Sequence, residues 1–352
     1  MSLADDLAAR ISATGPLTIA DYMAECLLHP RYGYYTTRDP LGRQGDFVTA
    51  PEISQMFGEL VGLCLAQAWT DRGGPSPFRL VELGPGRGTL MADMLRATRN
   101  VPGFHDAFDL HLIEASPVLR QTQSQTINRP LTHHDNLASV PEGPLFLVAN
   151  EFFDALPIRQ FQRAGAGWRE RLVGLHDGQL AIGLSDPTRP DFLTHRMDDT
   201  SEGDIVEHCA AAQTVAAEIG HRIATHGGVA LVFDYGDWRS LGDTLQAVRG
   251  HDKVSPFDGP GTADLTSHVD FEAIARTVSP ATTSRLTPQG VFLERLGITQ
   301  RAQTLAAALS GEKLDNHVAA HRRLTHPEEM GTLFKTMAII GKDSPLPPGF
   351  AK

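Results

Sequence analysis

Cysteine is scarce in this chain of 352 residues, and the three cysteines present are not spaced for a structural role. Cys26, Cys64 and Cys209 lie far apart and form no C-x-x-C pair. A disulfide scaffold and a cysteine zinc site are therefore disfavoured, and a reducing, cytoplasmic location is predicted. The 15 histidines lack the i, i+4 helical pairing with an acid that zinc hydrolases show, so we expect no metal site.

A basic excess and long apolar runs are also missing. The 31 basic side chains are outnumbered by 42 acidic ones, which gives a net charge of −11. Without clustered Lys and Arg, binding to nucleic acid is disfavoured, whereas a basic protein substrate would be tolerated. No apolar run reaches membrane-spanning length, and the amino terminus has neither an apolar signal region nor an Arg-rich stretch. We therefore expect no membrane insertion and no targeting segment.

The rest of the chain is organised around residues 78–91, FRLVELGPGRGTLM. Apolar residues typical of a buried strand come first, and apolar residues at helical spacing come last. Between them, Gly84, Gly86 and Gly88 form a turn. This pattern predicts the first βα unit of a nucleotide-binding α/β sheet, in which glycines let the backbone approach a ligand at the carboxyl end of the strand.

The spacing of these glycines decides which nucleotide is favoured. The dinucleotide fingerprint requires a third glycine three positions after the second, and that position is Thr89. An NAD oxidoreductase is therefore disfavoured. The glycines alternate instead, and Glu82 lies on the strand just before them, an E-x-G-x-G-x-G pattern that resembles motif I of class I S-adenosylmethionine-dependent methyltransferases. A glycine turn alone is weak support, since any tight βα turn can use glycines.

A second informative stretch, residues 45–57, precedes the glycine turn. Thr49 and Glu52 match a capping box with proline in the first turn, and the apolar residues that follow predict one continuous helix. Helix initiation accounts for Thr49 but leaves Asp46 and Phe47 unexplained. A helix amino terminus beside a nucleotide site is a natural lid or anion-contacting element.

Acidic residues also follow the next two expected strands. Glu114 comes directly after the strand predicted at 109–113, where ribose hydroxyls are usually received. The alternative is that Glu114 caps a helix that starts near Ser116, and we favour the ribose role. Asp135 follows a weaker strand and is placed to accept a hydrogen bond from an adenine amino group.

The strand predicted at 144–149 runs directly into three polar residues, Asn150, Glu151 and Asp154. Groups at the carboxyl end of a central strand face the ligand crevice of an open α/β sheet. Either Asn150 or Asp154 alone could simply fix a turn. That explanation is less satisfactory for all three together.

The remaining patterns predict an α/β fold with a doubly wound, mostly parallel sheet. Ser2 and Thr18 are expected to cap two short amino-terminal helices. Further along, we expect a β-hairpin around Asp177-Gly178, a helix at 205–223, and strands at 228–236 and 330–340. By segment, the prediction is an N-terminal helical extension and lid at 1–75, a core at 76–157 and 225–352, and an insertion on the substrate side at 158–224.

Five segments together resemble the MidA family, the mitochondrial complex I assembly methyltransferases and their bacterial relatives. They are GDFVTAPEIS (45–54), ELGPGRGTL (82–90), ANEFFDALP (149–157), TLQAV (244–248) and GTADLTSHVDF (261–271). The resemblance implies a class I methyltransferase fold, S-adenosylmethionine as methyl donor and, for the mitochondrial members, symmetric dimethylation of an arginine on a complex I subunit. It leaves a homodimer open.

The resemblance also implies roles for individual residues. The donor-binding residues would be Asp46, Phe47, Thr49, Glu82, Gly84, Gly86, Gly88, Glu114, Asp135 and Asn150. Arginine stays protonated in solution, so its methylation needs carboxylates that hold the guanidinium. Glu151 and Asp154 are the predicted catalytic pair, with Asp234 behind them. The alternatives are methylation of a small molecule, RNA or another protein, and an assembly chaperone that keeps the donor pocket without catalysis.

Overall fold

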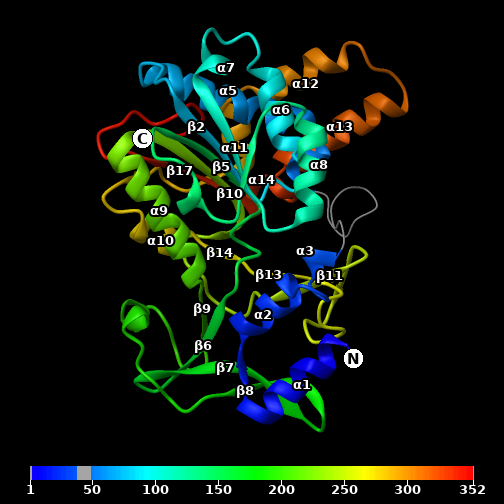
Figure 1. The fold of residues 1–352 in the computed structure, drawn as a ribbon, viewed down its shortest axis with the longest axis vertical. Helices are drawn as coiled ribbons and strands as arrows, with labels where there is room; N and C mark the ends of the chain where they lie inside the picture. Colours follow the sequence, from blue (N-terminus) through cyan, green and yellow to red (C-terminus); the bar gives the residue numbers. More distant parts are fainter. Residues whose placement is uncertain (1, 38–48, 352) are drawn as a thin grey trace. The chain divides into compact units, whose positions relative to one another are not determined.

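The computed structural model describes residues 2–37 and 49–351, which Figure 1 colours along the sequence. Contacts between residues divide the chain into two units. Unit 1 comprises 1–40, 154–213 and 237–270, and unit 2 comprises 41–153, 214–236 and 271–352. These boundaries differ from the predicted segments, whose functional meaning as lid, core and insertion stays a prediction.

Unit 2 is built on a sheet whose strand order is β15-β17-β10-β5-β2-β3-β4, with β16 pairing with β17. The strands are β2 (Phe78–Leu83), β3 (Phe108–Ile113), β4 (Thr132–His134), β5 (Leu145–Asn150), β10 (Gly228–Asp237), β15 (Thr282–Thr283), β16 (Thr287–Pro288) and β17 (Phe334–Ile340). Strands β4, β3, β2, β5 and β10 are parallel, and β17 is antiparallel to β10. The predicted α/β fold with a doubly wound, mostly parallel sheet is confirmed.

The order of these strands indicates where a ligand would bind. From β2 the chain proceeds outward to β3 and β4, then returns to β5 and β10 on the other side of β2. The direction of winding thus reverses between β2 and β5. In open α/β sheets ligands bind outside the carboxyl ends of the strands at this reversal.

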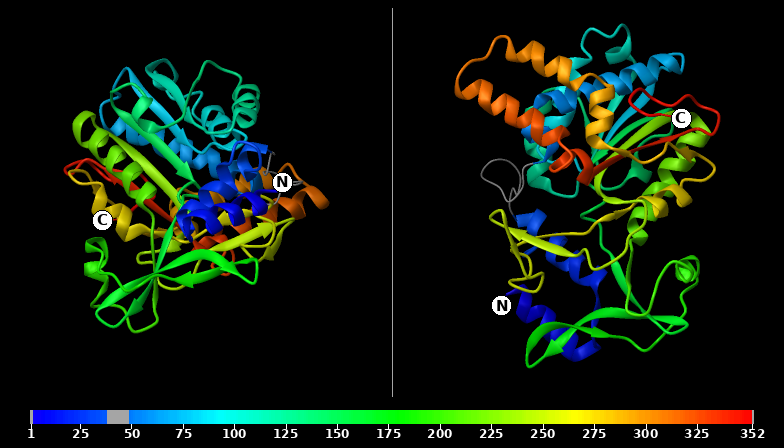
Figure 2. Two further views of the ribbon diagram at one scale, coloured as in Figure 1. Left: turned by 60° about the horizontal axis from the view of Figure 1, so that its bottom comes forward. Right: turned by 180° about the vertical axis from the view of Figure 1, so that it is seen from behind.

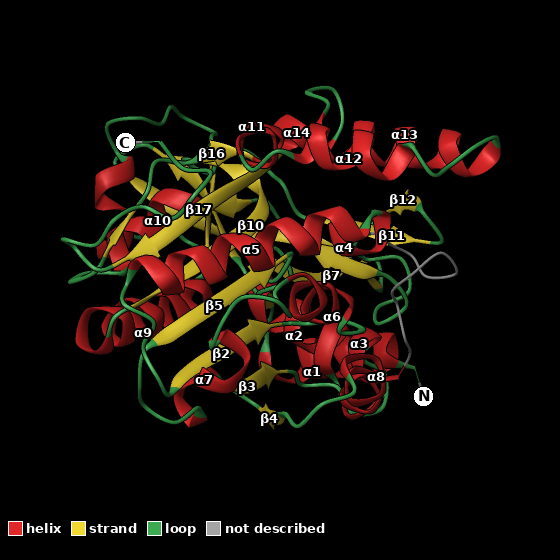
Figure 3. Ribbon diagram, turned by 90° about the horizontal axis from the view of Figure 1, so that it is seen from above, coloured by secondary structure: helices red, strands yellow, loops and turns green. Residues whose placement is uncertain are grey.

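Helices of unit 2 pack against its sheet and against one another, and Figure 3 shows α5 running alongside the strands. The helices are α4 (Ala50–Ile53), α5 (Gln55–Asp71), α6 (Thr89–Ala97), α7 (Phe104–Ala107), α8 (Pro117–Ile127), α9 (Ala210–His226), α10 (Phe271–Thr277), α11 (Gln289–Arg295), α12 (Ile298–Ala306), α13 (Glu312–Thr325) and α14 (Met330–Leu333). Helices α12 and α13 lie side by side (Figure 2). Within the described parts of the chain, no helix is both long and apolar enough to cross a membrane.

Two glycines let α5 and α6 approach closely. A Cβ added to Gly58 would lie 2.6 Å from Cβ of Asp93, and one added to Gly62 would lie 2.7 Å from Cα of Met94. Real Cβ atoms do not come this close, so only glycine fits at both positions on α5. Helix α6 begins at Thr89, directly after the glycine turn. The close packing of α5 against α6 therefore fixes the position of the residue at which the turn ends.

Unit 1 contains short helices and two antiparallel sheets. Its helices are α1 (Leu3–Thr14), α2 (Ile19–Leu28) and α3 (Tyr34–Thr37). One sheet joins β1 (Leu17–Thr18), β7 (Gly167–His176), β6 (Arg159–Ala164) and β9 (Ile205–His208), with β8 (Gln179–Leu184) paired to β7, and the other joins β12 (Asp252–Val254), β11 (Gln246–Arg249) and β13 (Asp264–Thr266). The predicted caps at Ser2 and Thr18 and the hairpin turn at Asp177-Gly178 are confirmed.

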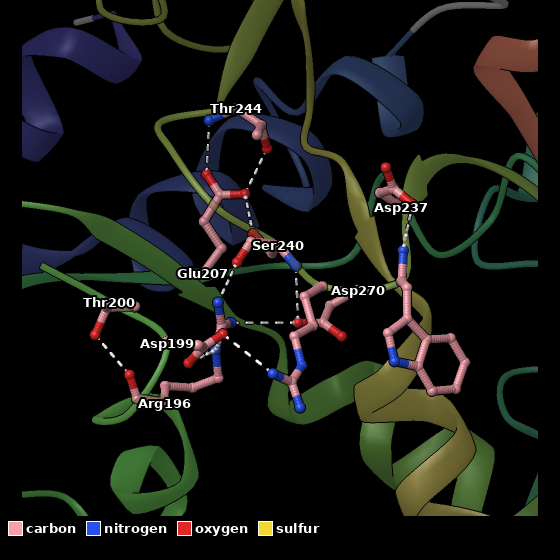
Figure 4. A network of polar contacts seen from close by, with 10 residues as sticks. Arg196, Asp199, Thr200, Glu207, Asp237, Ser240, Thr244 and Asp270 are labelled. Atoms are coloured by element: carbon pink, nitrogen blue, oxygen red, sulfur yellow. Dashed lines mark hydrogen bonds and ion pairs between the residues drawn. The ribbon is translucent and has the colours of Figure 1, made fainter.

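A polar network with buried members connects separate segments of unit 1 (Figure 4). The guanidinium of Arg196, which is 2% exposed, donates to a carboxylate oxygen of Asp199 at 3.0 Å and to the carbonyl of Ser240 at 2.9 Å. The buried carboxylate of Glu207 accepts from the backbone N–H of Thr244 at 2.9 Å and from the Ser240 hydroxyl at 3.4 Å. These contacts tie the segment around β9 to the loop that precedes β11.

Two predicted elements are wrong in part. The first residues of the helix predicted at 205–223 form strand β9, which pairs with β6, and α9 begins only at Ala210. The strand predicted at 330–340 starts as the short helix α14, and β17 begins at Phe334.

Candidate active site

The glycine turn lies at the carboxyl end of β2, beside the reversal of strand order. Gly84, Gly86 and Gly88 have φ values of +58°, +53° and +83°, a region that other residues enter at a cost. A Cβ on Gly84 would lie 3.0 Å from the ring of Phe152, so that ring packs directly over the turn. A side chain at Gly84 would push against the aromatic ring as well as strain the backbone.

Glu82 carries a buried carboxyl on the strand that leads into this turn. The residue is 2% exposed, and its Oε2 atom has no hydrogen-bond partner among the described residues. Burial, with a smaller contribution from the charge of Glu114, raises the pKa of Glu82 to about 8. An unsatisfied oxygen of this kind is costly unless a ligand or an ion supplies its partner.

Glu114 lies at the end of β3, as predicted, and both of its carboxylate oxygens accept hydrogen bonds. Oε1 accepts from the backbone N–H of Ser116 at 2.8 Å, and Oε2 accepts from the side-chain amide of Gln123 at 3.0 Å. Glu114 therefore does bond to the backbone at the start of α8, as the alternative interpretation expected. This bond does not exclude binding of ribose hydroxyls, because each carboxylate oxygen can accept a second hydrogen bond. Burial raises the pKa of Glu114, and the bond from Ser116 opposes that shift.

Asp135, at the end of β4, is exposed and already paired. Its carboxylate accepts from the guanidinium of Arg120, which also donates through Nε to the carbonyl of Glu114 at 2.8 Å. Arg120 thereby joins the ends of two neighbouring strands. Any contact of Asp135 with an adenine would have to share its carboxylate with this guanidinium.

The chain makes an unusual turn where β5 ends. Glu151 has a φ of +52°, which is uncommon for a residue with a side chain and is characteristic of functional sites. Two hydrogen bonds to β10 hold the turn: the N–H of Glu151 donates to the carbonyl of Phe233 at 2.9 Å, and the N–H of Phe153 donates to the buried carboxylate of Asp234 at 3.0 Å. Asp234 thus fixes the backbone that carries Glu151.

The carboxylate of Glu151 contacts the segment that precedes α5. Its Oε1 accepts from the N–H of Ala50 at 3.2 Å and from the side-chain amide of Asn150 at 3.1 Å. Glu52, in the same segment as Ala50, accepts from the hydroxyl of Thr89 at 2.5 Å. The segment is therefore bonded both to the start of α6 and to the end of β5.

The capping box predicted at Thr49 is wrong. Thr49 precedes α4 but its side chain makes no capping hydrogen bond, and Glu52 contacts Thr89 instead. Ser54 breaks the predicted helix in two and caps α5 through the N–H of Met56 at 3.2 Å. Asp46 and Phe47, predicted to lie in the same lid, fall outside the described residues.

Comparison with known proteins agrees with this geometry. A family model for S-adenosyl-L-methionine-dependent methyltransferases matches residues 60–289. The chain belongs to this methyltransferase family. It is 37% identical to the mitochondrial protein arginine methyltransferase NDUFAF7 homolog of Drosophila melanogaster, over 96% of this chain and 85% of the relative. Identity with the human mitochondrial protein arginine methyltransferase NDUFAF7 is 36%, over 94% of this chain and 81% of the relative.

A solved structure from Burkholderia thailandensis is similar along nearly the whole chain. That protein was crystallised with S-adenosyl-homocysteine, the product that remains when the donor has lost its methyl group. It has a TM-score of 0.83 and 28% identity, and the match covers 99% of this chain and 93% of that one. The resemblance noted from the five segments is confirmed, and S-adenosylmethionine is the cofactor of this family.

The residues at the reversal of strand order fit this donor. S-adenosylmethionine offers ammonium, hydroxyl and amino donors, and Glu82 Oε2 and Asn150 Oδ1 are buried acceptor atoms with no partner among the described residues. The glycine turn gives close backbone approach, and Glu114 stands at the end of the adjacent strand. The individual donor contacts stay predictions.

The predicted cytoplasmic location is contradicted by these relatives, since the Drosophila and human proteins are both named mitochondrial. Cysteine spacing indicated only a reducing environment, and it could not distinguish one reducing compartment from another.

Regarding metals, the described residues contain no group of three or more His, Cys, Asp or Glu that could hold an ion.

Asp154, the second predicted catalytic carboxylate, belongs to unit 1, whereas Glu151 belongs to unit 2. Asp154 is buried, and its carbonyl accepts from the N–H of Ser267 at 2.9 Å.

In the same unit the hydroxyl of Tyr35 donates to Asp264 at 2.8 Å. Burial, followed by the charges of Asp264 and Asp154, holds the pKa of Tyr35 well above its ordinary value.

Three residues of the site were missed at the level of sequence. They are Gln123, which contacts the glycine turn and Glu114, Arg120, which joins two strand ends, and Phe152, which covers Gly84. A signal for Gln123 did exist. It lies four residues from both Leu119 and Ile127, the two other buried residues of α8, and is therefore a polar side chain on the buried face of a helix.

Proposed function

We propose that this methyltransferase transfers methyl groups to an arginine of a respiratory complex I subunit. The product would be symmetric dimethylarginine, and the modification would support assembly of complex I. The observation that carries this proposal is the similarity, along nearly the whole chain, to curated proteins named as protein arginine methyltransferases. The acidic balance of the chain, −11, suits a basic segment as substrate.

The proposed roles of the residues follow from their positions. S-adenosylmethionine, when bound, supplies a methyl group on a sulfonium. The chain must then align a guanidinium nitrogen with it, and alignment supplies much of the acceleration in such a transfer. Glu151 suits that task because two hydrogen bonds to β10 hold its backbone and two donors hold its Oε1. Asp154 is proposed as the second carboxylate.

Carboxylates are the appropriate chemistry for arginine. A guanidinium presents five N–H donors in a planar fork, which carboxylates can bind while one nitrogen stays directed at the donor. The other proposed donor contacts begin with Glu82, Gly84, Gly86 and Gly88, which would line the methionine and ribose part. Glu114 would bind the ribose hydroxyls and Asp135 the adenine edge, while Thr49 and Asn150 would contribute from the lid and from the segment after β5.

The test compares methylation with donor binding. Glu151→Gln and Asp154→Asn should each lower the rate of arginine methylation on isolated complex I subunits by about 10- to 100-fold, because one charge-assisted hydrogen bond to the guanidinium is lost. Their Kd values for S-adenosylmethionine in calorimetry should stay within about threefold of the wild-type value. If both variants lose donor binding, Glu151 and Asp154 belong to the donor site instead.

Two outcomes would overturn the proposal itself. Wild-type protein that binds S-adenosylmethionine but methylates no arginine, while methylating a small molecule, would change the substrate class. Donor binding without any transfer would favour an assembly chaperone that keeps the pocket. A homodimer stays a prediction that light scattering on the purified protein can check.

A further inference from the structure

We propose that Gln123 is a positioning residue of the donor site, which holds the glycine turn and the ribose-binding carboxylate of Glu114 in one fixed arrangement. The inference rests on donor binding alone and is independent of what the enzyme methylates. Gln123 itself need not touch the donor, because its effect passes through the two groups that it holds.

The first observation is that a single amide nitrogen joins the two parts of the site. Nε2 of Gln123 donates to the carbonyl of Gly86 at 2.7 Å and to Oε2 of Glu114 at 3.0 Å. Gly86 lies in the turn after β2, and Glu114 follows β3. The side chain is completely buried, so water does not compete for these bonds.

The second observation fixes which way the amide faces. Both partners of Nε2, a carbonyl and a carboxylate, can only accept hydrogen bonds, so the NH₂ group must face them. The amide oxygen then faces the ring of His133, whose Nε2 lies 2.9 Å away. His133 must therefore carry its proton on Nε2 and donate it to Gln123. Burial lowers the pKa of His133, which favours the neutral ring.

Together these contacts form a chain from β4 through α8 to the ends of β3 and β2. His133 orients the amide of Gln123, and the amide presents one hydrogen to Gly86 and one to Glu114. With the other carboxylate oxygen held by the N–H of Ser116, the plane of the Glu114 carboxylate is set. A carboxylate set in this way can distinguish ligands that carry ribose hydroxyls from ligands that lack them.

The experiment measures that distinction in calorimetry with two probes, S-adenosylhomocysteine and its 2′,3′-dideoxy analogue. For the wild-type protein we expect at least about tenfold tighter binding of the hydroxylated probe, the usual effect of hydrogen bonds to a charged group. In Gln123→Leu the two Kd values should come to within about threefold of each other. Loss of the bond to the Gly86 carbonyl should weaken both probes, and loss of the bond to Glu114 should further weaken the hydroxylated probe alone.

Two further variants test the hydrogen bonds themselves. Gln125→Leu is the matched control, since Gln125 is an exposed glutamine on the same helix, and it should keep the wild-type ratio. In Gln123→Glu an ionised carboxylate would face Glu114, so the ratio should be lost at pH 8. It should recover in part near pH 5, where a protonated carboxyl can donate one hydrogen bond.

The results separate a positioning role from a purely structural one. A Gln123→Leu protein that keeps the wild-type ratio would overturn the proposal, as would equal weakening of both probes. If Gln123→Leu does not fold, His133→Phe removes only the bond to the amide oxygen and should still reduce the ratio, and an unchanged ratio there would overturn the proposal. Absence of arginine methylation in the wild-type protein would affect none of these affinities.

Discussion

At the scale of single residues, Glu82 makes the folded protein sensitive to pH. Its pKa rises from 4.5 to about 8 because the carboxyl is buried and lies near Glu114. The unfolded chain loses this proton near pH 4.5, whereas the folded protein keeps it to about pH 8. The stability that Glu82 contributes is therefore fully present below about pH 4.5 and is lost as pH rises through about 8.

Replacing Glu82 with glutamine should remove this dependence. We expect the free energy of unfolding of the ligand-free wild-type protein to fall between pH 5 and pH 9 more steeply than that of Glu82→Gln, and the variant to be the more stable protein at pH 9. Urea unfolding at pH 5, 7 and 9 measures both. Parallel curves for the two proteins would contradict the assigned pKa.

Residues whose chemistry is local could be predicted from sequence, and residues whose partners are distant could not. Gly84 and Glu114 follow strands directly, so their positions at the carboxyl edge were predictable. Glu52 looked like a capping residue, yet its partner is Thr89, which lies 37 positions along the chain. Gln123 needs both Gly86 and Glu114 in place before its role is visible.

At the scale of elements, the close approach of α5 and α6 connects helix packing with donor binding. We expect Gly62→Val to lower the free energy of unfolding by about 1–3 kcal/mol, the usual cost of overpacking. It should also weaken S-adenosylmethionine binding, because α6 begins at the residue after the glycine turn. Thermal unfolding and calorimetry measure the two effects.

The control for this change is Leu63→Val, which places the same β-branched residue at the neighbouring position, where the side chain is 44% exposed. Leu63→Val should change stability by less than about 1 kcal/mol, as exposed substitutions usually do. Equal effects of Val at positions 62 and 63 would mean that the helix propensity of valine, not the contact between α5 and α6, determines the loss of stability in Gly62→Val.

Elements with strong periodicity were predictable, and short ones depended on tertiary context. The apolar run of β5 and the alternation of the β7–β8 hairpin specify strands by themselves. Residues 205–208 are too short for periodicity to decide, and they became β9 because β6 offers an unpaired edge. Ser54 divides α4 from α5 because its side chain accepts from Met56, a choice that the apolar pattern does not reveal.

At the scale of the whole molecule, the proposed donor contacts among the described residues belong to unit 2. Addition of S-adenosylhomocysteine should therefore slow amide hydrogen exchange in peptides from 78–97, 108–127 and 145–153, since ligand binding suppresses local opening. Peptides from the hairpin at 167–184 in unit 1 should exchange at unchanged rates. Equal protection of the hairpin would contradict the assignment of the donor contacts to unit 2.

The position of β17 in the sheet has a consequence for biosynthesis. All the proposed donor contacts occur before residue 152, but β10 pairs along most of its length with β17, which is synthesised much later, at Phe334–Ile340. A nascent chain therefore carries a full set of ligand-binding residues while the apolar edge of β10 is still unpaired, a state prone to aggregation. A chain that terminates prematurely near residue 300 would contain all five resembling segments but would lack β17, and we expect it to aggregate through the unpaired edge of β10.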